Sequence, residues 1–95
     1  QFMAKKVAVI CGAGIATSTY VAGKLEQLCK ERGLDVHFSK GLALEADRLV
    51  QGADLIVATT PITKDYGIPV VMAVSFLTGI GEEETIQQIL SFLSE

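Results

Sequence analysis

Cys11 is the residue of this chain whose surroundings are best suited to chemistry. It follows a short apolar run rich in valine and isoleucine, and it precedes a loop of small residues and then a run of hydroxyl residues. The apolar run predicts a buried strand, and the hydroxyl residues predict the start of a helix. This order places one thiol next to the backbone N–H groups of a helix N-terminus.

The loop after the cysteine has the composition of an anion site. The first N–H groups of a helix have no partners within the helix and carry about half a positive charge, which favours a phosphate or a thiolate. Small side chains let successive amides surround phosphate oxygens, and hydroxyl groups add further donors. We expect the phosphate-binding loop to consist of Gly12, Ala13, Gly14, Ile15, Ala16, Thr17 and Ser18.

The second cysteine and the lone histidine are expected to have structural roles. Cys29 lies on the apolar face of the helix predicted after the loop, so we expect it to be buried. His37 alternates with apolar residues in a predicted strand and should face solvent. A zinc site needs about four ligands, and the chain has one histidine and two widely spaced cysteines, so we expect no metal and no cofactor.

Size and composition predict one compact domain, over residues 4–95. The chain has 95 residues, 49% of them hydrophobic and 20% charged, which suits a single core. Gln1-Phe2, before Met3, is expected to be an addition to the natural protein. A net charge of −3 with scattered Lys and Arg argues against nucleic acid as a partner. The chain lacks an apolar run of the ~18 residues that a membrane span needs and a signal-peptide pattern, so we expect a cytoplasmic protein.

Apolar runs predict four strands separated by helices and one loop. We expect strands at 5–10, 34–39, 54–58 and 69–73, helices from about Thr17 to Gly33, at 41–51 and from Glu82 onward, and a flexible segment at 74–81. This alternation predicts an α/β fold, a Rossmann-like three-layer sandwich whose open parallel sheet has helices on both faces and strand 34–39 at an edge. Ligands of such folds bind beyond the carboxyl ends of the strands, where Cys11 is placed.

Thr59 and Thr60 directly follow the predicted strand 54–58 and leave the sheet at the same edge as Cys11. Two interpretations remain open for this pair. The hydroxyl groups can contact the loop or a substrate, or they can be ordinary threonines at the end of a strand.

Other functions that use such loops fit less well. A dinucleotide site needs G-x-G-x-x-G, but Thr17 stands at the third glycine, and the Gly-Lys-Ser/Thr of a nucleotide P-loop is absent. A cysteine-dependent phosphatase has a motif that resembles Cys-x5-Arg. In this chain, Thr17 takes the place of the arginine that would clamp the transition state. A phosphatase-like enzyme therefore remains an alternative, as does an interaction module in which Cys11 senses redox state.

The chain from about Lys5 to Leu93 resembles the enzyme IIB component of the bacterial phosphoenolpyruvate-dependent sugar phosphotransferase system, specifically its galactitol-type family. The segments that carry the resemblance are Cys11-Gly12, Ala16-Thr17-Ser18-Thr19, Thr59-Thr60 and Phe76-Leu77-Thr78-Gly79-Ile80-Gly81.

The resemblance implies a phosphotransferase with a phosphatase-like loop and with Cys11 as its catalytic residue. Cys11 would accept a phosphoryl group from a phosphohistidine of the IIA component and pass it to a polyol or sugar held by the IIC membrane permease. The loop from Gly12 to Ser18 would hold the phosphate, without a metal or cofactor. The protein is expected to be a monomer that associates with the permease from the cytoplasm.

Overall fold

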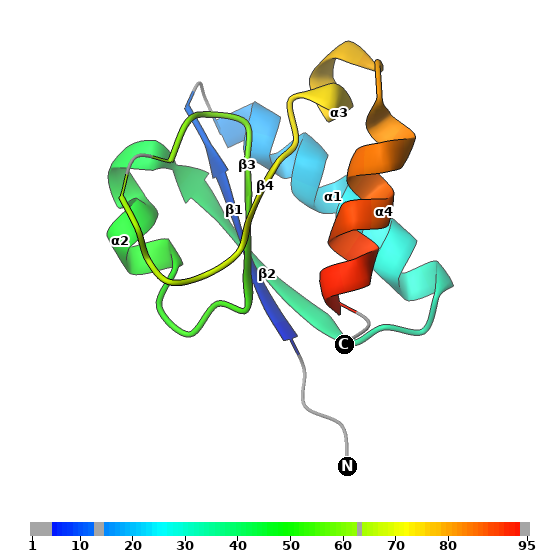
Figure 1. The fold of residues 1–95 in the computed structure, drawn as a ribbon, viewed down its shortest axis with the longest axis horizontal. Helices are drawn as coiled ribbons and strands as arrows, with labels where there is room; N and C mark the ends of the chain where they lie inside the picture. Colours follow the sequence, from blue (N-terminus) through cyan, green and yellow to red (C-terminus); the bar gives the residue numbers. More distant parts are fainter. Residues whose placement is uncertain (1–4, 13–14, 63, 94–95) are drawn as a thin grey trace.

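Four parallel strands form the centre of the molecule (Figure 1). The computed structural model describes residues 5–12, 15–62 and 64–93, and for residues 15–18 it describes the backbone alone. The strands are β1 (Lys5–Cys11), β2 (Val36–Leu42), β3 (Leu55–Ala58) and β4 (Val70–Met72). Their order across the sheet is β2-β1-β3-β4, and every neighbouring pair is parallel. The predicted four-stranded parallel sheet is confirmed.

β1 is a central strand and is deeply buried. It pairs with β2 over its whole length, from Lys5 opposite Val36 to Cys11 opposite Leu42, and with β3 on its other side. Residues 7–11 have no exposed surface. A strand covered on both faces needs a continuous apolar run, which is the pattern that predicted it.

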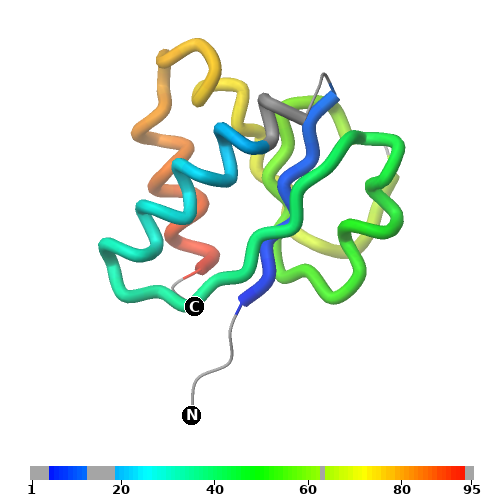
Figure 2. The backbone as a smooth tube through the Cα atoms, turned by 180° about the vertical axis from the view of Figure 1, so that it is seen from behind, coloured from blue at the N-terminus to red at the C-terminus, as the bar shows by residue number. Residues whose placement is uncertain are grey.

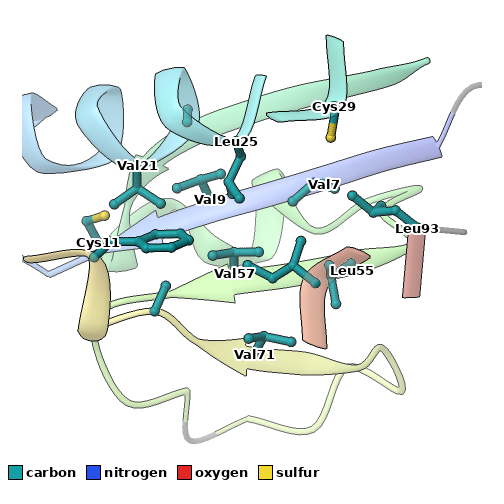
Figure 3. Packing of buried hydrophobic residues seen from close by; sticks show 14 residues of the cluster. Val7, Val9, Cys11, Val21, Leu25, Cys29, Leu55, Val57, Val71 and Leu93 are labelled. Carbon is teal, nitrogen blue, oxygen red and sulfur yellow. The ribbon is translucent and has the colours of Figure 1, made fainter. Parts of the chain in front are cut away.

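Helices cover both faces of the sheet, as Figures 1 and 2 show from opposite sides. On one face lie α1 (Ile15–Glu31) and α4 (Glu82–Leu93), and their buried side chains share a core cluster with those of the sheet (Figure 3). On the other face, α2 (Ala46–Leu49) and the connection between β3 and β4 close over a second cluster. The expected three-layer α/β sandwich is therefore present.

α1 ends as predicted but begins earlier. Its last turn closes at Gly33, with a φ of 70°, where the N–H of Leu34 donates to the carbonyl of Cys29 at 2.9 Å. This is a glycine-terminated helix end. The start was expected near Thr17 from the hydroxyl residues, but the helix begins at Ile15. Isoleucine and alanine are compatible with a helix, so it forms as soon as the small-residue loop ends, and the hydroxyl residues fall inside it.

The second strand lies later in the chain than predicted, and the helix after it is shorter. β2 was expected at 34–39 and runs from Val36 to Leu42, because β1 pairs with it over these residues. The expected helix at 41–51 is reduced to a 3₁₀ turn, η1 (Ala43–Glu45), and α2. The side chains of Glu45 and Leu49 fold back over Gly41, where a Cβ would lie 2.7 Å from Oε1 of Glu45 and 2.9 Å from Cδ1 of Leu49.

The segment 74–81 is not simply a loop. It contains a short helix, α3 (Ser75–Thr78), which ends at Gly79 with a φ of 79°. Phe76 is buried in the first core cluster and anchors this turn to the sheet. A single apolar anchor among small and polar residues does not produce a helical period, which is why the pattern indicated a flexible segment.

The two residues expected to be structural behave as expected. Cys29 is buried on α1, and burial raises the pKa of its thiol, with the charge of Arg32 opposing the shift. His37 is exposed on β2, which is an edge strand as its half-buried alternation indicated.

Candidate functional site

The carboxyl ends of β1 and β3 define the candidate site. Across the sheet, β2 lies on one side of β1, whereas β3 and then β4 lie on the other side. The direction in which strands are added therefore switches between β1 and β3. In open parallel sheets, ligands bind at such a switch point. Cys11 is the last residue of β1, and α1 begins at Ile15, only four residues later. The predicted succession of strand, cysteine and helix N-terminus is thus present at the expected edge.

The side chain of Cys11 lies on the sheet face that α1 and α4 cover. It belongs to the same buried cluster as Val9, Val21 and Phe76, and it has no exposed surface. Figure 3 shows Cys11 at one end of this cluster, close to the end of β1. The sulfur is therefore closed to solvent in this structure.

The expected phosphate-binding loop is described in part. Gly12 is exposed at the end of β1, while Ala13 and Gly14 lie outside the described residues. The backbone from Ile15 to Ser18 forms the first turn of α1, and the side chains of these four residues lie outside the description. The N–H groups of this turn are those that a helix leaves without internal partners. They follow Cys11 closely in the chain, as an amide cradle requires.

Thr59 and Thr60 continue β3 beside the end of β1. The N–H of Thr59 donates to the carbonyl of Ile10 at 3.0 Å. The side chain of Thr60 lies against Gly12, since a Cβ on Gly12 would be 2.9 Å from its Oγ1. The sequence left the role of this pair open, and the structure brings Thr60 to the residue that follows Cys11. In the sequence, this contact is indicated only by a glycine after one predicted strand and a pair of threonines after another.

Both arginines lie away from the strand end that carries Cys11. Arg32 follows the last turn of α1, at the opposite end of that helix from Cys11. Arg48 lies on α2, where it pairs with Glu45 at 2.8 Å. A cysteine phosphatase also uses an aspartate on a later loop as a general acid, and Asp65 on the connection between β3 and β4 instead accepts a hydrogen bond from the N–H of Gly67 at 2.9 Å in a local turn. The structure therefore supplies none of the bidentate guanidinium contacts that a cysteine phosphatase uses.

Residues 5–12, 15–62 and 64–93 contain no group of three His, Cys, Asp or Glu side chains placed to hold a metal ion. None of the helices in these ranges is long and apolar enough to cross a membrane.

Residues 6–88 match the family model described as "PTS system, Lactose/Cellobiose specific IIB subunit". The chain is 36% identical over 91 residues to the provisionally named phosphotransferase enzyme IIB component SgcB of Escherichia coli K12, covering 96% of this chain and 99% of that protein. It is 33% identical over 92 residues to the galactitol-specific EIIB component of the same strain, covering 96% and 98%.

A solved structure shares the fold. The lactose-specific IIB component domain from Streptococcus pneumoniae matches with a TM-score of 0.64 at 18% identity, over 95% of this chain and 98% of that one. The fold and the site thus define a small α/β protein with a cysteine at the switch point of a parallel sheet. The chain belongs to the IIB family of the sugar phosphotransferase system. It is a phosphotransferase, and a IIB component functions together with IIA and IIC components.

Proposed function

We propose that Cys11 is the residue that carries the phosphoryl group. The observation that carries this assignment is the place of the thiol, at the end of a central strand and four residues before the N-terminus of α1. Of the two cysteines, only Cys11 has this position, because Cys29 lies in the last turns of α1 and faces the core. A helix N-terminus favours a phosphate through its free N–H groups and its partial positive charge.

The proposed reaction has two transfers. The Cys11 thiolate attacks phosphorus on a phosphohistidine of the IIA component, so that the S–P bond forms and the N–P bond breaks, and the imidazole nitrogen keeps the electron pair. A hydroxyl of the sugar then attacks the same phosphorus, and the S–P bond breaks to release the thiolate. The backbone N–H groups from Gly12 to Ser18, with the hydroxyl of Ser18 as a further donor, hold the phosphoryl oxygens in both steps.

The base that deprotonates the sugar hydroxyl is assigned to the IIC partner. His37 is the only histidine of this chain. It pairs in register with Lys6, five residues before Cys11 on β1, which separates the two positions by about 16 Å along the strand. The imidazole cannot span that distance, so the acceptor site must supply the base.

We further propose a galactitol-like polyol as the acceptor, carried by a single domain over residues 4–95. The curated relatives named for galactitol support this choice, since they are 32–33% identical over nearly the whole chain, whereas the lactose-specific structure is 18% identical. On this proposal the protein is a monomer that meets its phosphohistidine donor in the cytoplasm and a polyol-loaded IIC permease at the membrane.

The test of the carrier is the intact mass of the protein after incubation with phosphoenolpyruvate, the general phosphotransfer proteins and a galactitol-type IIA. The wild type is expected to gain one phosphate and Cys11→Ser none. Cys29→Ser is the matched control, because it removes the other thiol. It is expected to keep the phosphate while losing about 1–3 kcal/mol of stability, since a hydroxyl replaces a buried thiol. Phosphate on the Cys11→Ser variant would refute the assignment.

A further inference from the structure

Gly12 is a glycine because of space and not because of backbone conformation. Its φ does not lie in the left-handed region, unlike that of Gly33, Gly52, Gly67, Gly79 and Gly81. A Cβ at this position would lie 2.9 Å from Oγ1 and 3.0 Å from Cβ of Thr60, closer than carbon and oxygen atoms approach without a bond. The side chain of Thr60 therefore occupies the place that a side chain on Gly12 would need.

Thr60 is poorly able to give way. The residues before it are held on both sides, since the N–H of Thr59 donates to the carbonyl of Ile10 at 3.0 Å and the N–H of Ala73 donates to that of Ala58 at 2.7 Å. Pro61 follows and restricts the backbone of the residue that precedes it. The Cβ of Thr60 is thus fixed by its backbone, and a side chain on Gly12 would have to move the loop that begins there.

We propose that Thr60 is a positioning residue for Cys11. Its side chain packs against Gly12 across the switch point between β1 and β3 and fixes the first peptide after the cysteine. This inference rests on the proposed role of Cys11 as the phosphate carrier. The amide groups that hold the phosphate start at this peptide, and a displacement of about 1 Å in a reacting site can cost about 100-fold in rate. The contact thereby links the end of β3 to the transfer step.

The contact is attributed to the volume of Thr60 and not to its hydroxyl. Among the described residues, Oγ1 of Thr60 has no hydrogen-bond partner, while both Oγ1 and Cβ reach the space beside Gly12. Valine has nearly the shape of threonine and no hydroxyl. Thr60→Val is therefore expected to keep far more transfer activity than Thr60→Gly, which removes the side chain.

The test is a size exchange between the two positions, read out as the rate at which Cys11 gains phosphate from the IIA donor. Gly12→Ala is expected to be slower than the wild type by about 10-fold or more, because the new methyl group displaces the loop. Thr60→Gly is expected to be slower as well, since Gly12 loses its support. The double variant is expected to be faster than Gly12→Ala alone, because the methyl group then fills the space left by Thr60. Ser91→Ala, exposed on α4, is the control and should match the wild type.

Three results would overturn the proposal: Gly12→Ala as fast as the wild type, a double variant no faster than Gly12→Ala, or Thr60→Val as slow as Thr60→Gly. In the last case a fast Thr60→Ser would show that the hydroxyl acts on the phosphate. Unfolding midpoints of the wild type, Gly12→Ala, Thr60→Gly and the double variant test the contact between Gly12 and Thr60 separately from the carrier role of Cys11. A non-additive midpoint with no phosphate on wild-type Cys11 would confirm the contact and refute both the carrier and the positioning role.

Discussion

Two buried thiols in one small protein differ in their surroundings and not in their burial. Cys11 and Cys29 belong to the same core cluster. Cys29 lies within α1, whose backbone N–H groups are already used in the helix, whereas Cys11 lies where a strand ends and a helix begins. The difference is in the nearby backbone, since only the helix N-terminus offers free donors to an anion.

Cys29 should make the protein less stable in alkali. Burial raises the pKa of its thiol above its ordinary value of 9.0, so the folded state holds a proton that the unfolded state releases. Stability from this group is complete below 9.0 and falls as the pH rises through the raised folded value. The unfolding midpoint of the wild type is expected to fall more steeply there than that of Cys29→Ala. Parallel curves for the two proteins would contradict this prediction.

At the scale of elements, two glycines in regular structure have opposite roles. Gly41 lies in β2, where a Cβ would meet the ends of the Glu45 and Leu49 side chains at 2.7 and 2.9 Å, so both ends would have to shift to admit a methyl group. Gly23 lies in the middle of α1 and has nothing within 4 Å of its Cβ position.

These contacts predict opposite effects of the same substitution. Gly41→Ala is expected to lower the free energy of unfolding by about 1 kcal/mol, because the methyl group displaces the ends of the Glu45 and Leu49 side chains. Gly23→Ala is expected to raise it by about 0.5–1 kcal/mol, since alanine favours a helix and meets no neighbour. Denaturant unfolding of the two variants checks both, and a neutral Gly41→Ala would show that these side chains shift without cost.

The connection between β3 and β4 covers one face of the sheet in place of a long helix. Besides its packing on the second core cluster, it makes polar contacts with α2. The hydroxyl of Tyr66 donates to Oδ1 of Asp47 at 2.6 Å, and Nζ of Lys64 lies 3.1 Å from the same oxygen. The hydrogen bond from Tyr66, followed by that from Lys64, lowers the pKa of Asp47. The ionised carboxylate therefore helps to hold the connection against α2.

Tyr66→Phe should reveal this tie through pH. A lowered pKa means that Asp47 adds stability above the ordinary pKa of an aspartate and loses it as the pH falls through the folded value. The variant keeps the ring that packs on the second core cluster but loses the hydroxyl. Its unfolding midpoint is expected to lie below that of the wild type at neutral pH and to approach it in acid. An equal gap at both pH values would assign the effect to packing.

At the scale of the whole molecule, the sequence predicted what depends on local pattern. The buried strand β1, the edge strand β2 and the helix from Glu82 onward each depend on a pattern within a few neighbouring residues, and each was confirmed. The later end of β2 was missed because it depends on pairing with β1. α3 was missed because it depends on burying Phe76.

The site divides in the same way. Cys11 and the small residues after it are adjacent in sequence, so their order alone predicted a site there. The contact between Gly12 and Thr60 joins residues 48 positions apart, and single-sequence patterns do not report such distances. Gly12 was interpreted only as a small residue that lets amide groups surround a phosphate. In the structure, the side chain of Thr60 also occupies the space that a side chain on Gly12 would need.

The burial of the Cys11 sulfur also bears on its oxidation. Oxidation of a cysteine by peroxides follows its exposure and its thiolate character, and the later products on that route are not reversed. A fully exposed phosphate carrier would face this damage during every interval between transfers. With no exposed surface at Cys11, the thiol is shielded at rest and meets solvent only when the site opens. If Cys11 carries the phosphate as proposed, the burial that closes the sulfur to a partner also protects it from oxidants between transfers.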